Sequence, residues 1–183
     1  MKKVIFIIMI ILVCSTAIFA QANVGFANGP AILTSIGQSA DYEMIRVLLT
    51  RSGIQFDLNV VIRANELSSA YNTLILVIGG SSKGLGDAGI SADEELVRTQ
   101  ALIARARELN MSIIAVHIGG EARRGALSDV FISYAVPLTD FVIVVAEGNN
   151  DGLFTNLANQ ARIPFNSVNR ISEVSSPLAA AFR

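Results

Sequence analysis

The stretch TLILVIGGSSKGLGDAGIS, residues Thr73–Ser91, decides the fold. Residues 73–78 are apolar at nearly every position, which is typical of a strand buried on both faces of a parallel sheet. A segment rich in glycine and serine follows, and Ser91 with Glu94 matches a capping box, which marks the start of a helix. The stretch therefore predicts a central strand, a long loop and an amphipathic helix.

The rest of the chain repeats this plan. Residues 56–62 alternate between apolar and polar side chains, which is typical of a strand at the edge of a sheet. Further strands are predicted at residues 31–36, 112–118, 141–146 and 165–169. Helices are predicted from a cap at Ser39 to residue 52, at 91–110, between Gly120 and Pro137, from Leu153 to Ala161 and around Pro177, with a short helical connection at 65–71.

Strands that alternate with helices favour an α/β fold. We expect a single three-layer sandwich around a mainly parallel sheet of five to six strands. Right-handed crossovers and an edge position for the second strand favour the order 2-1-3-4-5, a flavodoxin-like or Rossmann-like arrangement.

The N-terminus has the pattern of an export signal. Lys2 and Lys3 precede an apolar run at residues 4–13, and Ala20-Gln21-Ala22 fits the small-x-small cleavage rule. Residues 1–22 are therefore predicted to be a signal peptide, and 23–183 a single exported α/β domain, periplasmic or extracellular.

Two alternatives to a cleaved signal stay open. The N-terminal segment could remain as a membrane anchor, or Cys14 could carry a lipid, although Val13 stands where a lipoprotein box requires a small residue. If the segment is removed, the mature chain has no cysteine and therefore no disulfide, thiol nucleophile or Cys metal ligand.

Charge excludes some classes of partner. Without Lys2 and Lys3, 12 of the 14 basic residues remain beside all 15 acidic ones, so the net charge is −3. No basic run and no basic patch interleaved with aromatics occurs, so nucleic-acid binding is not expected. The sequence has no cluster with metal-ligand spacing and indicates neither a metal nor a cofactor.

Ligands of such sheets bind beyond the carboxyl ends of the strands, where the strand order reverses. Here that switch point is predicted between the first and third strands. The loops at 35–39, 79–91, 119–125 and 147–152 are expected at this edge, and they are rich in Gly, Ser and Asn.

Residues Gly84–Gly89 match the GxGxxG pattern of dinucleotide-binding proteins, but the context is wrong. The glycines come after the third strand rather than the first. The next helix carries Asp93, Glu94 and Glu95 in its first turn, and these carboxylates would repel a pyrophosphate.

Residues Gly80–Gly84 match the GxSxG pattern of serine hydrolases. A nucleophile elbow requires a helix directly after the serine, whereas the seven residues 85–91 are predicted to follow the motif before the helix begins. A convergent triad of Ser82, His117 and Asp151 across neighbouring strand ends stays conceivable, because triads do not depend on chain order.

The remaining polar groups of this edge suggest a binding site for a small polar or anionic ligand. Lys83 could meet an anion or simply pair with Asp87, and Arg123 with Arg124 could form an anion fork or lie on a surface helix. His117, the single histidine, could be a satisfied rim residue. The predicted ligand-binding residues are Ser39, Gly79, Gly80, Ser81, Ser82, Lys83 and Arg123.

Four segments together resemble one family: SIGQSADYEMIRVLL, LVIGGSSKGLGDAGIS, HIGGEARRG and IPFNSVNRISEV. The chain is similar, over about residues 32–182, to an exported bacterial family catalogued as a domain of unknown function. The resemblance implies a single α/β domain and export, and it supplies no catalytic residues.

Three functions follow as hypotheses. The first is a non-catalytic, exported binding protein for a small polar or anionic ligand. The second is a serine hydrolase that uses Ser82 and His117. The third is a protein-interaction module, which a large exposed apolar patch would favour.

Overall fold

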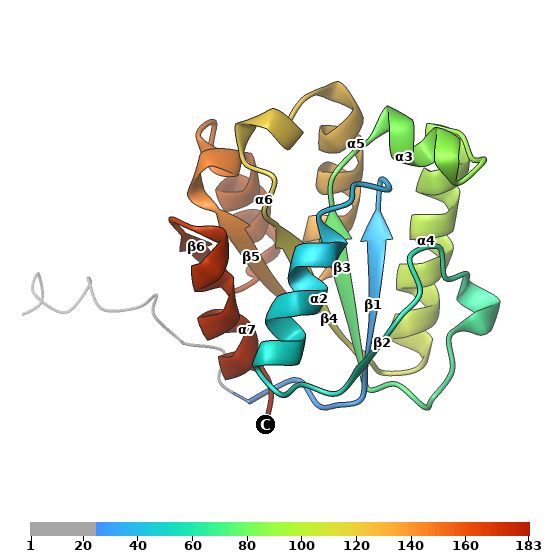
Figure 1. Ribbon diagram of the computed structural model, residues 1–183, viewed down its shortest axis with the longest axis vertical. Helices are drawn as coiled ribbons and strands as arrows, with labels where there is room; N and C mark the ends of the chain where they lie inside the picture. Colours follow the sequence, from blue (N-terminus) through green and yellow to red (C-terminus); the bar gives the residue numbers. More distant parts are fainter. Residues whose placement is uncertain (1–24) are drawn as a thin grey trace, which may run out of the picture.

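The computed structural model describes residues 25–183, in which six strands form one fully parallel sheet of order β2-β1-β3-β4-β5-β6 (Figure 1). The predicted order 2-1-3-4-5 is confirmed, and a sixth strand extends it. The strands are β1 (Ala31–Ile36), β2 (Phe56–Leu58), β3 (Thr73–Ile78), β4 (Ser112–His117), β5 (Phe141–Val145) and β6 (Phe165–Val168).

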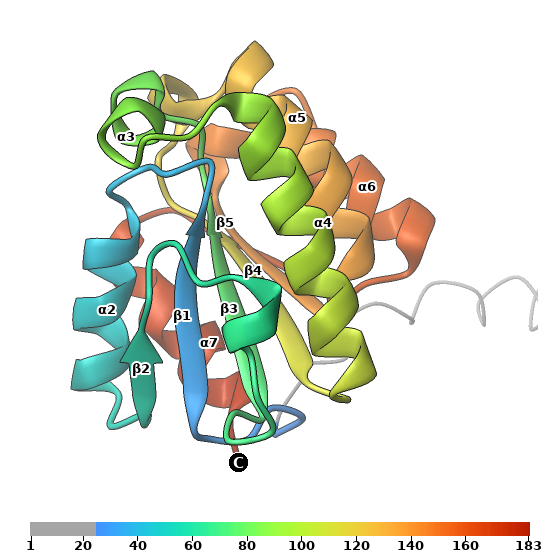
Figure 2. The same ribbon diagram turned by 90° about the vertical axis from the view of Figure 1, so that its right-hand side faces the viewer.

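Helices cover both faces of the sheet, so the expected three-layer sandwich is confirmed (Figure 2). Helices α2 (Tyr42–Arg51) and α7 (Ser175–Ala181) lie on one face, and α4 (Ala92–Glu108), α5 (Ala126–Ala135) and α6 (Leu153–Ala161) lie on the other. A short helix α3 (Ser82–Asp87) lies at the carboxyl edge. Single turns of 3-10 helix are η1 (Ala64–Glu66), η2 (Glu121–Arg123), η3 (Val136–Leu138), η4 (Ala146–Asn149) and η5 (Ile171–Val174).

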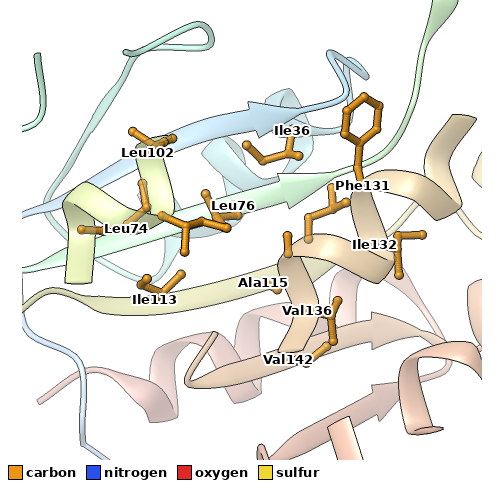
Figure 3. Packing of buried hydrophobic residues seen from close by; sticks show 14 of the residues in the cluster. Ile36, Leu74, Leu76, Leu102, Ile113, Ala115, Phe131, Ile132, Val136 and Val142 are labelled. Atoms are coloured by element: carbon orange, nitrogen blue, oxygen red, sulfur yellow. The ribbon is translucent and has the colours of Figure 1, made fainter. Parts of the chain in front are cut away.

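The core is divided by the sheet into two apolar layers. Side chains that alternate along β1 and β3 point to opposite faces, so Leu74 and Leu76 join one layer while Ile75 and Val77 join the other. Figure 3 shows the layer beneath α4 and α5, where Phe131 packs beside Ile36 at the carboxyl end of β1. Every residue of β1 and β3 is buried, as a central strand of a parallel sheet requires.

Several predicted details are wrong. The segment predicted as a loop at 79–91 contains α3, the strand predicted at 56–62 ends at Leu58, and the connection at 65–71 holds only η1. Val130, which the periodicity places on the inner face of its helix, is 51% exposed. Asp41 rather than Ser39 is the N-cap residue of α2.

The predicted signal peptide and Cys14 lie outside the described residues. Within residues 25–183, no helix is long and apolar enough to cross a membrane.

Candidate ligand-binding site

The strand order reverses between β1 and β3, which makes this the switch point of the sheet. Here the loop after β1 contacts the end of β3. The Ser39 N–H donates to the Gly79 carbonyl at 3.1 Å. Gly37 has a φ of 85°, and a Cβ there would lie 2.7 Å from the Gly79 oxygen, so only glycine fits this close approach. Gln38 also takes a positive φ, of 59°. Asp41 follows this loop, and its side chain lies near the ends of the neighbouring strands β3 and β4.

Asp41 is the least satisfied group of this edge. Its Oδ2 is buried and has no hydrogen-bond partner among the described residues. The same oxygen lies 2.8 Å from where a Cβ on Gly119 would be and 3.4 Å from where one on Gly79 would be. The other oxygen, Oδ1, is 3.7 Å from the Nε of Arg123, beyond hydrogen-bond distance. Asp41 therefore lies against Gly79 and Gly119, the residues that follow β3 and β4.

His117 ends β4 and is fully buried. Its Nδ1 lies 2.8 Å from the carbonyl oxygen of Ile78, and a carbonyl only accepts, so Nδ1 carries a proton. Burial lowers the pKa of His117, although the carbonyls of Ile78 and Gly120 and the charge of Asp41 oppose this shift. The imidazole is therefore neutral near pH 7, and its Nε2 is a hydrogen-bond acceptor without a well-formed partner among the described residues.

Arg124 ties together the two segments that cover His117. It bonds to the carboxylates of Asp129 and Asp151 and donates to the Gly148 carbonyl. These bonds raise the pKa of Arg124 and lower that of Asp151 to about 2. A Cβ on Gly148 would lie 2.7 Å from the His117 Nε2, so this glycine is in close contact with the ring. Arg124 is thus a structural clamp, and it is not available as half of an anion fork.

A buried ion pair supports the loop from below. The Oε1 of Glu95 accepts from the Gly37 N–H at 2.8 Å and from the Gln38 side chain at 3.0 Å. Arg98 pairs with Glu95 at 2.7 Å and donates to the carbonyls of Ser35 and Ile62. The apolar periodicity of residues 91–110 predicts Arg98 on the outer side of the helix, which is wrong, because its side chain is only 10% exposed. Glu95 holds the loop in the geometry that positions Asp41.

The glycine- and serine-rich segment after β3 is committed mostly to internal contacts. Ser81 caps α3 by accepting from the Gly84 N–H at 3.0 Å, and the Gly80 N–H donates to Ser128 at 2.8 Å. A Cβ on Gly84 would lie 1.9 Å from the Gln38 carbonyl oxygen. These glycines therefore allow the loops after β1 and β3 to pack closely together. This close packing accounts for the many glycines of the segment without a ligand.

The other predicted binding residues are distributed unevenly. The Gly79 N–H donates to the Ile36 carbonyl, and Ser39 Oγ accepts from the Asp41 N–H at 3.3 Å. Lys83 pairs with Asp87 on an exposed turn of α3, which was the simpler of its two interpretations. Of the predicted set, Ser39, Gly79 and Arg123 lie around Asp41.

The hydrogen bonds of a Ser82, His117 and Asp151 triad are not formed. The Nδ1 of His117 bonds to Ile78, its Nε2 has no hydrogen-bond partner within residues 25–183, and Asp151 bonds to Arg124. The predicted distance between the serine and the next helix is nevertheless wrong, because the helix α3 begins at Ser82 itself. Ser82 does not adopt the positive φ of a strained turn.

Sequence reasoning missed Asp41 and Glu95. The sequence predicts Asp41 only as a first-turn residue of the helix after Ser39, and its place directly after the loop of the first strand is the signal that could single it out. Among residues 25–183, no group of three or more His, Cys, Asp or Glu side chains is arranged to hold a metal ion.

Comparisons with known proteins give a family and little else. The family model described as "Domain of unknown function (DUF6305)" matches residues 28–182. No curated protein matches the chain. A truncated form of 3-deoxy-D-arabino-heptulosonate 7-phosphate synthase from Thermotoga maritima is similar over 86% of this chain, with 12% identity and a TM-score of 0.32. The chain spans 49% of that solved structure, and the likeness carries no functional argument.

Proposed function

Since the chain belongs to the family described as a domain of unknown function (DUF6305), which brings no activity with it, we propose a function from the site: a non-catalytic binding protein for a small polar ligand. The ligand is held at the carboxyl edge of the sheet, around Asp41. The role is exercised outside the cytoplasm, as the export pattern at residues 1–22 implies.

The unpartnered Oδ2 of Asp41 carries this proposal. A buried carboxylate oxygen without a hydrogen bond costs free energy, because water is lost and nothing replaces it. In native structures such a group takes its missing partner from an ordered water, an ion or a bound ligand, and we propose a ligand here. The oxygen also lies at the switch point, where parallel α/β sheets bind their ligands.

The surroundings favour binding over chemistry. Among the described residues, the side chains of Asp41 and His117 are not hydrogen-bonded to each other, and neither side chain is hydrogen-bonded to a serine hydroxyl. Catalysis by a nucleophile requires its base within hydrogen-bond reach. A ligand held by Asp41 would therefore be bound without being converted.

Native mass spectrometry of the purified protein, together with a thermal-shift panel of small polar metabolites, tests the proposal. We expect a bound mass or a shift in the wild-type protein that Asp41→Asn abolishes. Lys83→Ala is the matched control, because Lys83 is exposed and paired with Asp87, and its loss should leave binding unchanged. Absence of any bound mass and any shift would count against the proposal.

The serine hydrolase alternative has its own test. A serine-reactive phosphonate should leave the wild-type protein unlabelled if Ser82 is only the first residue of α3. Labelling that disappears in Ser82→Ala but persists in Ser81→Ala would replace the binding proposal with hydrolysis.

A further inference from the structure

We propose that the ligand carries a protonated amine, which binds Asp41 in the place that the Arg123 side chain now covers. This inference rests on the proposed binding function and names the chemical class of its ligand.

The buried side-chain atoms of this site that lack a hydrogen-bond partner are acceptors. The Oδ2 of Asp41 and the Nε2 of His117 are both buried and unpartnered among the described residues. Because Nδ1 of His117 carries the ring proton, the lone pair of the neutral ring is at Nε2, which is in close contact with Gly148. Glu147 adds a carboxylate near Gly120, whose Cβ would lie 3.1 Å from the Glu147 Oε2. A ligand that satisfies the carboxylates of Asp41 and Glu147 must bring hydrogen-bond donors, and a cation suits two carboxylates best.

The cations at this edge are already paired, apart from Arg123. Arg124 is bonded to Asp129 and Asp151, and Lys83 is bonded to Asp87. Neither is available to receive an anionic ligand without losing these partners. The anionic part of the predicted ligand class is therefore not favoured.

Arg123 has the geometry of a weakly held cover. Its Cβ and Cγ would lie 2.3 and 2.0 Å from a Cβ on Gly119, so the side chain lies directly on this glycine. Its Nε is 3.7 Å from the Asp41 Oδ1, and 40% of the side chain is exposed. Glycines flank the η2 turn that carries it, with φ of 58° at Gly120 and 124° at Gly125. An ammonium group can displace Arg123 at low cost, because at 3.7 Å its Nε makes no hydrogen bond to Asp41.

Three probes with one carbon skeleton separate the possibilities: 1,4-diaminobutane, 1,4-butanediol and succinate. Calorimetric titration of the purified protein should show binding of the diamine, weakened about tenfold or more by Asp41→Asn. Removal of the competing cation in Arg123→Gln should tighten diamine binding about two- to fivefold. Arg46→Gln removes an exposed, Glu43-paired arginine of α2 and should change nothing.

The outcomes distinguish this inference from the proposed function. Asp41-dependent binding of the diol or of succinate without the diamine would overturn the amine assignment and keep the binding function. Weaker diamine binding in Arg123→Gln would overturn the displacement of Arg123. If none of the three probes binds, the amine assignment fails, and the broader polar panel on wild type and Asp41→Asn then decides the binding function separately.

Discussion

Glu95 and Arg98 form a buried ion pair one helical turn apart on α4, with 2.7 Å between the Glu95 Oε2 and the Arg98 Nε. Both side chains have hydrogen-bond partners for their polar atoms. Glu95 accepts from the Gly37 N–H, and Arg98 donates to two backbone carbonyls. A buried pair of this kind sets geometry more than it adds stability. Here it fixes the loop from which Asp41 projects.

Removal of one member should be severe. In Glu95→Ala the Arg98 charge stays buried without its counter-ion, and the Gly37 N–H loses its acceptor. We expect the free energy of unfolding to fall by about 3–5 kcal/mol. Urea denaturation measures it, and Glu43→Ala, which breaks the exposed pair with Arg46, should cost less than about 1 kcal/mol. Equal losses in the two variants would show that the Glu95 pair does not support the loop.

Asp41 should behave in the opposite way. Its Oδ2 has no partner to lose, so Asp41→Asn removes a partly buried charge without breaking a hydrogen bond of that oxygen. We expect the free energy of unfolding to stay the same or to rise. If urea denaturation shows that the free energy of unfolding falls by more than about 1 kcal/mol, Asp41 has a structural role instead.

Two glycines of α3 give a matched pair for packing. A Cβ at Gly84 would meet the Gln38 backbone, whereas one at Gly86 meets nothing within 4 Å. Gly84→Ala should therefore lower the free energy of unfolding by about 1–3 kcal/mol. Gly86→Ala should raise it by about 0.5–1 kcal/mol, because alanine restricts the unfolded chain and favours the helix. Thermal unfolding of the two variants compares them directly, and equal effects would contradict the close contact of α3 with the first loop.

His117 should make stability fall on acidification. Burial lowers its pKa in the folded state, so the unfolded chain binds a proton first as the pH drops below about 6.5. Asp41 and Arg124 are the charges that act on the ring, in opposite directions. Stability should therefore decrease from pH 7 to pH 5 in the wild type, and this decrease should be absent in His117→Gln. The same slope in both proteins would show that the histidine is not buried in its neutral form.

Asp151 acts in a separate pH window. Its pKa is lowered to about 2 by Arg124, so its contribution is present above about pH 4 and is lost only as the pH falls towards 2. The two effects do not overlap, and NMR titration of the only histidine of the chain can follow the first of them alone.

The strands were predictable because their pattern is local. The ends of β1 and β3 were predicted to the residue, since buried parallel strands are mostly apolar and a glycine follows each of these two. Helix α3 was missed because Gly84 and Gly86 have poor helix propensity. What stabilises it is tertiary: Leu85 is buried and Gly84 packs on the first loop.

The site was less accessible from the sequence. The switch point could be located, because it follows from strand order, and Ser39, Gly79 and Arg123 do surround it. Asp41 stands out because its Oδ2 is buried without a hydrogen-bond partner among the described residues. This depends on the tertiary structure, and no sequence pattern predicts it. The burial of Arg98 likewise depends on carbonyls that two other segments supply.

The most direct test compares native mass spectra of the wild-type and Asp41→Asn proteins, purified side by side and then exposed to the same panel of polar molecules. Binding at the switch point predicts a small molecule on the wild type that is absent or strongly depleted on Asp41→Asn. The same bound mass on both proteins, or none on either, would contradict a ligand site built around Asp41.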